Sequence, residues 1–291
     1  MAPLRNCLTV DLESVSHRYV TERRHLRKDW KKAVEAEESR KALDNGRTPV
    51  LTRLILRALA KHDQAATFFV VGEIYDWYPD LIDEIHEEGH EVAYHSHTHT
   101  PFNNSSSLQR EMERSVDFLE KYRPEGFRSA RASITPDCLH ELARRGFIYD
   151  SSTYGPFSSC AKVEGIIEVP ISTYPLRRER PLTFPRQLSP ILLRDLEIPF
   201  GSGYFISLLS LISPTLISHF IEKSSERGVP SILCLHPWQL GRKRLESTSK
   251  LGLAHLGLLP YDIPCDRAFN HLIRNHRFCA ISEMLQDTGI L

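Results

Sequence analysis

Residues 8–13 have the sequence LTVDLE, an apolar strand pattern that ends in acidic residues. Side chains alternate between the two faces of an extended strand, so Asp11 and Glu13 point to the same side. One carboxylate could bind a metal ion there while the other handles protons. This combination indicates a metal-assisted hydrolase.

A histidine cluster, HSHTH at residues 95–99, could complete such a site. His95 and His99 are four residues apart, and one turn of helix would place both imidazoles on one face, where they could share a small cation. His97 lies two residues from each and should point elsewhere, but it is kept as a candidate substrate contact.

Strands and helices alternate along the chain. Short apolar stretches predict strands at residues 7–12, 66–71, 91–95, 126–128, 147–150, 166–169, 231–236 and 278–281. Helical patterns lie between them at residues 50–62, 79–88, 108–122, 136–145 and 264–275, several opened by proline. Most strands are apolar on both faces, which predicts a parallel sheet covered by helices. Seven or eight such units in one 291-residue domain suit a closed or nearly closed α/β barrel.

Polar residues fall at or just past the ends of five predicted strands. They are Asp11, His95, Arg128, Asp150 and His236. In parallel α/β folds the functional side chains gather at the carboxyl ends of the strands. These five residues are therefore the first candidates for one shared site.

Two segments interrupt the alternation. Residues 18–47 form a charged, mainly basic helical stretch inserted directly after the first strand. Such a stretch is usually a solvated helix or loop, but over the mouth of a barrel its cations could steer an anionic substrate. Residues 175–202, rich in proline and arginine, are expected to form a long loop rather than a separate domain.

Composition excludes several classes of function. The 37 basic and 37 acidic side chains balance, so no global field attracts nucleic acid or an anionic membrane. The longest apolar run, residues 204–220, is broken by Pro214, which favours two packed helical pieces over a membrane span and leaves peripheral membrane contact open. The first residues lack a secretory signal. We therefore expect a cytoplasmic protein whose six scattered cysteines are free thiols.

Five ordered motifs resemble those of the polysaccharide deacetylases, the NodB-homology group also called carbohydrate esterase family 4. They are TVDLE (9–13), ATFFVVG (66–72), GHEVAYHSHTH (89–99), GFR (126–128) and LHP (235–237). The similarity covers most of the chain. Three further stretches, residues 146–152, 201–205 and 236–238, are most similar to the branch found beside bacterial exopolysaccharide clusters.

The resemblance implies a deformed (β/α) barrel of about seven parallel strands that removes an acyl group, usually acetyl, from the nitrogen of an amino sugar. It also implies one divalent metal ion, with Zn²⁺ first and Co²⁺, Ni²⁺ or Fe²⁺ as alternatives. By position, Asp11 would be the general base, and His95 and His99 two metal ligands. The family usually has a second aspartate directly after the base. Here Leu12 occupies that position, and Glu13 is the expected third ligand.

The remaining motif positions imply further roles. Arg128 matches the arginine beside the base, although Ala130 stands where the family has proline. His236 matches the general acid. The aspartate–tryptophan pair that orients this histidine is missing, and Asp150 is the nearest candidate for its role. Candidate substrate contacts, besides His97, are Trp238 and Tyr204.

Three functional classes follow from these residues. The first is a metal-dependent deacylase of an N-acylated amino sugar, either a polymer or a small nucleotide-, lipid- or antibiotic-linked sugar. The second is an amidohydrolase that acts on a non-sugar amide or ureide without metal, which Leu12 makes credible. The third is an inactive carbohydrate-binding barrel, disfavoured because the base and the acid are both present.

Overall fold

The computed structural model describes residues 5–21, 26, 28–102, 104–176, 197–241 and 263–291. Its centre is a nine-stranded sheet. Along the sheet the strands follow the order β12 (Ile232–Leu235), β1 (Asn6–Leu12), β2 (Thr67–Val70), β3 (Glu91–Tyr94), β4 (Gly126–Phe127), β5 (Tyr149–Asp150), β8 (Ile166–Glu168) and β7 (Ala161–Val163). The ninth strand, β13 (Phe278–Cys279), pairs with β1 and stands outside this order. Within the sheet all pairs are parallel except β7 with β8.

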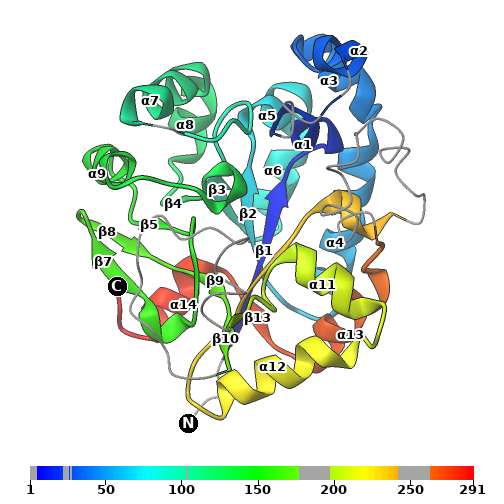
Figure 1. Ribbon diagram of the computed structural model, residues 1–291, viewed down its shortest axis with the longest axis vertical. Helices are drawn as coiled ribbons and strands as arrows, with labels where there is room; N and C mark the ends of the chain where they lie inside the picture. The colour runs from blue at the N-terminus through cyan, green and yellow to red at the C-terminus, as the bar shows by residue number, and fades with distance from the viewer. Residues whose placement is uncertain (1–4, 22–25, 27, 103, 177–196, 242–262) are drawn as a thin grey trace.

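Helices surround this sheet (Figure 1). They are α4 (Arg47–Lys61), α5 (Gly72–Trp77), α6 (Pro79–Glu87), α7 (Ser105–Arg114), α8 (Val116–Tyr122), α9 (Pro136–Arg144), α11 (Gly203–Ser210), α12 (Thr215–Ser225), α13 (Asp266–Asn275) and α14 (Ile281–Asp287). Among the described residues the two ends of the strand order, β12 and β7, do not pair, so the sheet curls without closing. The predicted α/β fold, a deformed barrel, is confirmed.

Several local predictions are also confirmed. Proline opens α6 and α9 as expected. The apolar run 204–220 forms the two helices α11 and α12, with Pro214 between them. The six cysteines are free. No helix in the described part of the chain has the length and apolar character needed to cross a membrane.

The predicted long loop 175–202 is described only at its two ends. Its middle, residues 177–196, lies outside the described residues. The flanking segments pair as two short antiparallel strands, β10 (Tyr174–Pro175) and β11 (Glu197–Ile198). A second small pair, β6 (Tyr154–Gly155) with β9 (Ile171–Ser172), is parallel.

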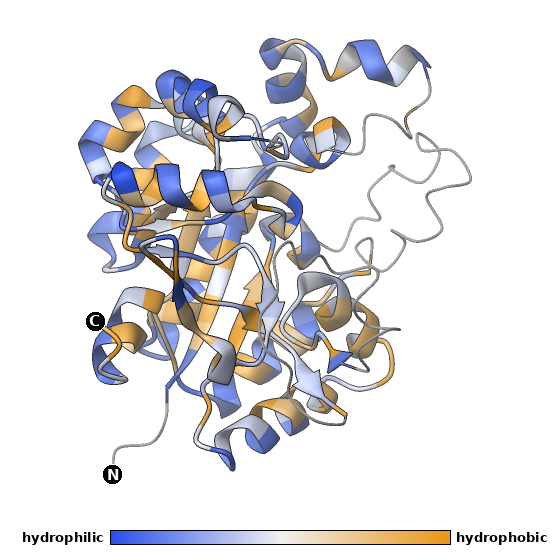
Figure 2. Ribbon diagram, turned by 60° about the vertical axis from the view of Figure 1, so that its left-hand side comes forward, coloured by the Kyte–Doolittle hydropathy of each residue, from blue (hydrophilic) through white to orange (hydrophobic). Residues whose placement is uncertain are grey.

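Strand β1 decides which side chains reach the interior of the barrel. All seven of its residues are buried. Leu8, Val10 and Leu12 pack into the large apolar cluster that also contains helix residues, whereas Cys7 belongs to the cluster on the other face. Asp11, which alternates with Val10 and Leu12, therefore faces inward at the carboxyl end of the strand. Figure 2 shows the apolar residues concentrated along the central strands.

The predicted insertion at residues 18–47 forms three helices and the start of α4. They are α1 (Val15–Thr21), α2 (Lys28–Ala33) and α3 (Glu37–Asp44). In Figure 1 they lie beyond the end of the sheet to which the β1 arrow points. Residues 22–25 and 27 lie outside the described residues.

A buried ionic network fastens this insertion to the barrel. Glu73 on α5 accepts hydrogen bonds from Arg40 on α3, at 2.8 Å to Oε2 and by a second contact to Oε1. His17 on α1 lies 3.1 Å from Glu73 Oε2 and stacks on Trp77 with ring centroids 5.1 Å apart. Burial alone would raise the pKa of Glu73, but hydrogen bonds from His17 and Arg40 lower it to about 2.

Removing the charge of Glu73 should destabilise the fold, because Glu73→Gln leaves the buried Arg40 guanidinium without a counter-charge. We expect a loss of about 3–5 kcal/mol in the free energy of unfolding at pH 7. The carboxylate stabilises the folded state above its ordinary pKa of 4.5, and this contribution is lost as the pH falls toward 2. Urea unfolding at pH 7 and pH 3 measures both effects.

The matched control is Glu120→Gln, which alters an exposed glutamate on α8. It should unfold at the same urea concentration as the wild type. A Glu73→Gln variant that is as stable as the wild type at pH 7, and equally sensitive to acid, would contradict the assigned role of the network.

Candidate active site

The carboxyl ends of four parallel strands bring the predicted site residues together. Asp11 lies at the end of β1, and His95, Arg128 and His236 directly follow β3, β4 and β12. All four side chains are buried. Their convergence follows from the register of the sheet, in which Val10 pairs with both Phe68 and Leu235.

Arg128 holds Asp11 in a fixed position. Its Nη1 donates to Asp11 Oδ1 at 2.6 Å and to the Thr9 hydroxyl at 2.7 Å. Burial would raise the pKa of Asp11, but the Arg128 charge, aided by His95 and His236, holds it well below its usual range. Oδ2 lies 3.7 Å from His95 Nε2 and remains directed at the histidines.

The segment containing the histidine cluster is a loop, so the predicted helical turn is wrong. Ser96 and His99 adopt left-handed backbone conformations, with φ of 62° and 58°. The amide of Gly72 donates to the carbonyl of Ser96 at 2.8 Å, and a Cβ at Gly72 would approach His97 Nδ1 to 2.5 Å. This close approach fixes a loop that still brings His95 and His99 together, with ring centroids 4.8 Å apart.

Three side chains at the centre of the site are suited to bind a cation. His95 Nδ1 lies 2.6 Å from the carbonyl oxygen of Arg128, which assigns the proton to Nδ1 and leaves the Nε2 lone pair free. This Nε2 and Glu13 Oε2 are both buried without a hydrogen-bond partner. His99 Nε2 is 3.1 Å from Glu13 Oε2, and its Nδ1 is held by the Thr21 hydroxyl at 2.7 Å.

The protonation states also suit a metal site. Burial lowers the pKa of His95 to about 4 and that of His99 well below its usual range, so both imidazoles are neutral. Burial and the nearby Asp11 charge raise the pKa of Glu13. A buried carboxylate with a raised pKa between neutral imidazoles is a group that a bound cation would stabilise. The donor set therefore fits a divalent metal.

A second possible donor set lies beside the first. Ligand atoms of Asp11, Cys234 and His236 are within 4.8 Å of one another. However, Asp11 is already neutralised by Arg128. The Cys234 thiol donates to Asp11 Oδ2 at 3.3 Å, and burial beside that carboxylate raises its pKa, which disfavours the thiolate that a metal needs. By chemistry the histidine–glutamate set is the better candidate, although among the described residues it is the Asp11, Cys234 and His236 atoms that lie within 4.8 Å of one another.

Gln239, which the sequence analysis missed, is the partner of His236. His236 Nδ1 lies 2.8 Å from Gln239 Oε1, so Nδ1 carries the proton and Nε2 faces the site. Gln239 is in turn fixed by donating to the Gly203 carbonyl and the Ser207 hydroxyl. The spacing His-Pro-Trp-Gln, with proline after the capping position, is a capping-box pattern that could have revealed the pair.

Asp150 does not orient His236, contrary to the prediction. It accepts hydrogen bonds from the amide and the hydroxyl of Ser152 at 2.9 and 2.7 Å. Ser152 in turn accepts from the amide of Ser129 at 2.7 Å. Asp150 is itself a paired residue of β5, opposite Phe127 of β4 and Glu168 of β8, and β12, which precedes His236, lies at the far end of the strand order.

Two predicted substrate contacts are placed elsewhere by the structure. His97 points away from the site, with Nδ1 3.0 Å from the Ser115 hydroxyl and Nε2 3.7 Å from Asp76. Tyr204 is half-buried on α11, and only its neighbour Gly203 lines the pocket. The left-handed backbone at Ser96 turns His97 outward.

A narrow pocket of about 90 Å³ opens onto the site. Trp238, a predicted contact, lines it and stacks on His236 with centroids 4.6 Å apart. The other lining residues are Asp11, Glu13, Arg18, Thr21, His99, Arg128, Arg131, Ala132, Tyr154, Ile171, Gly203, Cys234 and His236. The insertion contributes two of these, Arg18 and Thr21.

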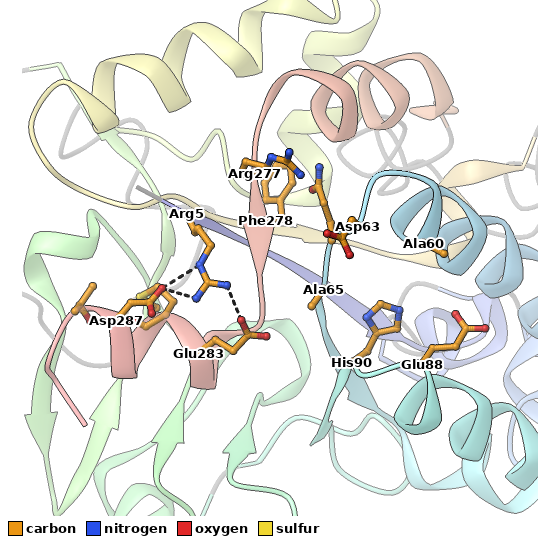
Figure 3. A pocket seen from close by; sticks show the side chains of 13 residues that line it. Arg5, Ala60, Asp63, Ala65, Glu88, His90, Arg277, Phe278, Glu283 and Asp287 are labelled. Atoms are coloured by element: carbon orange, nitrogen blue, oxygen red, sulfur yellow. Dashed lines mark hydrogen bonds and ion pairs between the residues drawn. The ribbon is translucent and has the colours of Figure 1, made fainter. Parts of the chain in front are cut away.

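A larger cavity of about 1070 Å³ lies at the other end of the strands (Figure 3). There Arg5, just before β1, is paired with Glu283 and Asp287 on α14. His90, just before β3, also lines it. Within the described residues the donors whose ligand atoms lie within 4.8 Å of one another, Asp11, Cys234 and His236, are at the carboxyl end and not in this cavity.

Replacing Gln239 should release His236. In Gln239→Leu the acceptor for Nδ1 is lost, so the imidazole no longer keeps one tautomer. The pKa of His236 should also fall, because the hydrogen bond that His236 donates to Gln239 raises it. NMR of ¹⁵N-histidine-labelled protein reports the tautomer and the titration of His236. Gln239→Glu keeps the acceptor and should restore the Nδ1 tautomer. Unchanged nitrogen shifts and titration in Gln239→Leu would show that the contact does not orient the ring.

Comparisons with known proteins bear on the family and the fold of this chain. The family model described as polysaccharide deacetylase matches residues 41–149. The chitooligosaccharide deacetylase of Sinorhizobium fredii is 42% identical over 73 residues, covering 25% of this chain and 33% of the relative. The peptidoglycan-N-acetylmuramic acid deacetylase PdaC of Bacillus subtilis is 30% identical over 112 residues, covering 37% and 24%. The chain thus spans about a third or less of the length of these relatives.

Solved structures share the fold across the whole chain. A crystal structure of a Mycobacterium smegmatis protein assigned as a polysaccharide deacetylase gives a TM-score of 0.60 at 16% identity, covering 100% of this chain and 92% of that one. The structure of PdaC from Bacillus subtilis gives 0.50 at 14% identity, with coverage of 100% and 95%. At sequence identities this low, the structural similarity is evidence for a shared fold alone.

Proposed function

Because this chain belongs to the polysaccharide deacetylase family, we propose that it hydrolyses the N-acyl bond of an amino sugar, most often releasing acetate. The substrate is an N-acetylated glycan or a smaller amino-sugar compound. Relatives with matching segments are named for chitooligosaccharides and peptidoglycan. The cytoplasmic location and the affinity to the exopolysaccharide branch stay predictions.

One observation carries this proposal. His95 Nε2 is buried without a hydrogen-bond partner, and Glu13 Oε2 is buried against His99 Nε2 at 3.1 Å, next to an aspartate that is held ionised by a buried arginine. Such atoms are costly to bury unless a ligand satisfies them. A carbohydrate-binding barrel without activity has no need of this arrangement.

His95, His99 and Glu13 would hold one divalent ion. Two imidazoles and a carboxylate suit Zn²⁺ and leave a position open, and Co²⁺, Ni²⁺ or Fe²⁺ accept the same donors. When bound, such an ion supplies a water of lowered pKa and polarises the substrate carbonyl.

The chain's own residues would move the protons. Asp11 Oδ1 is occupied by Arg128, so Oδ2 accepts the proton of the attacking water. Gln239 holds the proton of the neutral His236 ring on Nδ1 and keeps Nε2 directed at the pocket, 3.9 Å from Asp11 Oδ2. Nε2 would first accept a proton from solvent, and the resulting imidazolium would then donate that proton to the departing amine. Each acid–base step of this kind contributes roughly 10²- to 10⁴-fold.

The size of the pocket favours a short acyl group. A pocket of about 90 Å³ has room for a group as small as acetyl. The sugar ring must then lie at the mouth of the pocket, where Trp238 offers an aromatic surface.

Asp11→Asn tests the proposal. The amide cannot accept the proton of the water, so acetate release from N-acetylated chitooligosaccharides should fall roughly 10²- to 10⁴-fold. Asp80→Asn, an exposed aspartate on α6, is the control for a lost charge. Thermal unfolding shows whether Asp11→Asn stays folded despite the unpaired Arg128. Full turnover by folded Asp11→Asn would refute the assignment of the base, and wild-type activity that survives exhaustive chelation would refute the metal.

A further inference from the structure

We propose that Thr21, the last residue of α1, positions His99 for metal binding, so that the insertion forms part of the metal centre. Thr21 does not bind the ion itself but acts through the imidazole of His99. The inference rests on the metal site of the proposed function. It adds to that site a positioning residue from a segment that interrupts the barrel pattern.

One hydroxyl group holds both the ring and the backbone of His99. Thr21 Oγ1 lies 2.7 Å from His99 Nδ1 and 3.0 Å from the His99 carbonyl oxygen. His99 is buried, and its backbone is left-handed with φ of 58°. A residue other than glycine keeps such a conformation only where surrounding contacts compensate for the strain. The two contacts with Thr21 are of this kind.

The hydroxyl of Thr21 accepts a hydrogen bond from the imidazole rather than donating one. Its single hydrogen has two carbonyl acceptors, that of His17 at 3.2 Å and that of His99 at 3.0 Å. With the hydrogen directed at either carbonyl, Oγ1 accepts from His99 Nδ1–H. The ring proton then lies on Nδ1, and the lone pair of Nε2 faces the centre of the site, 3.1 Å from Glu13 Oε2.

His95 is oriented in the same way by a different part of the chain. Its Nδ1 lies 2.6 Å from the carbonyl oxygen of Arg128, the residue directly after β4. Histidines that bind metal through one ring nitrogen commonly donate the other to an oxygen atom, which fixes the tautomer and the orientation of the ring. The barrel therefore supplies this support for one proposed ligand, and the insertion supplies it for the other.

The place of the Thr21 hydroxyl depends on how α1 is anchored. His17 lies one turn before Thr21, and its Nδ1 accepts from the amide of Ser14 at 3.0 Å. The proton of His17 is therefore on Nε2, which donates to Glu73 Oε2 at 3.1 Å. Arg40 on α3 donates to the same carboxylate oxygen at 2.8 Å. The ionic network that fastens the insertion thus also fixes the residue that contacts His99.

Thr21→Val tests the inference, because it removes the hydroxyl and keeps the branched shape of the side chain. The dissociation constant for Zn²⁺ should rise about 10- to 100-fold, the usual effect of losing the outer partner of a histidine ligand. Competition with a chelator of known zinc affinity measures this constant without any substrate. Thr21→Ser keeps the hydroxyl and should bind Zn²⁺ nearly as tightly as the wild type.

Thr288→Val is the matched control. Thr288 is the C-cap residue of α14, and its hydroxyl donates to the carbonyl of Met284, four residues earlier, at 2.8 Å. The hydroxyl of Thr21 has the same relation to the carbonyl of His17. Both valine variants therefore lose a contact with the preceding helical turn, which thermal unfolding of the metal-free proteins compares. Only Thr21→Val should lose zinc affinity.

The tautomer of His99 provides a second measurement, which requires no metal. In ¹⁵N-histidine-labelled protein without metal, the nitrogen shifts should show Nδ1 protonated in the wild type and in Thr21→Ser. Thr21→Val lacks the oxygen acceptor, so its shifts should move toward a mixture of the two tautomers. A wild-type ring protonated on Nε2 would show that the hydroxyl donates to the imidazole, and it would overturn the inference.

The outcomes separate this inference from the proposed function. Unchanged zinc affinity in Thr21→Val, or equal losses in Thr21→Val and Thr21→Ser, would overturn the positioning role and leave the deacylase proposal intact. Wild-type protein that binds no Zn²⁺ would overturn both the role of Thr21 and the proposed metal site. Zinc binding that depends on Thr21, in a protein that releases no acetate from N-acetylated chitooligosaccharides, would refute the proposed reaction and leave the role of Thr21 standing.

Discussion

The ion pair between Arg128 and Asp11 organises the carboxyl end of this barrel. The Arg128 side chain bonds to Asp11, Thr9 and Ser151, and its backbone carbonyl fixes the tautomer of His95. The guanidinium also lies 4.0 Å from the centroid of Phe69. One residue thus sets the charge of the proposed base and the orientation of a proposed ligand. Removing either partner of such a buried pair typically costs about 3–5 kcal/mol, because the other charge is left unpaired.

The same strand geometry accounts for the departure from the usual family motif. Leu12 is fully buried in the cluster shared with the helices, so the position after the base faces away from the site. Glu13 returns to the face of Asp11 and meets His99. The proposed base and the proposed ligand therefore lie at alternate residues on the interior face of β1 and its continuation, as the period of two in an extended strand predicts.

The sequence predicted the parts of the structure that follow from a local motif or from a periodic pattern of apolar residues. Buried parallel strands, proline-opened helices and polar residues at strand ends identified the barrel and brought Asp11, Arg128, His95 and His236 to one place. The predictions that were wrong concern contacts between residues that only the folded chain brings together. In the loop 95–99, left-handed residues at Ser96 and His99 replace the expected helical turn, and Gly72 packs closely against this loop. The residue that hydrogen-bonds His236 is Gln239, three positions later in the chain, and not Asp150 on another strand. No periodic pattern in the sequence indicated the ion pairs of Glu73 with Arg40 and His17.

The central claim is that Glu13, His95 and His99 bind one metal ion. Diffraction data collected at the zinc absorption edge, from crystals of the protein loaded with Zn²⁺, test it most directly. The account predicts a single anomalous peak at about 2.0–2.2 Å from His95 Nε2, His99 Nε2 and a Glu13 oxygen. A peak among Asp11, Cys234 and His236 instead, or no peak at the carboxyl end of the barrel, would contradict it.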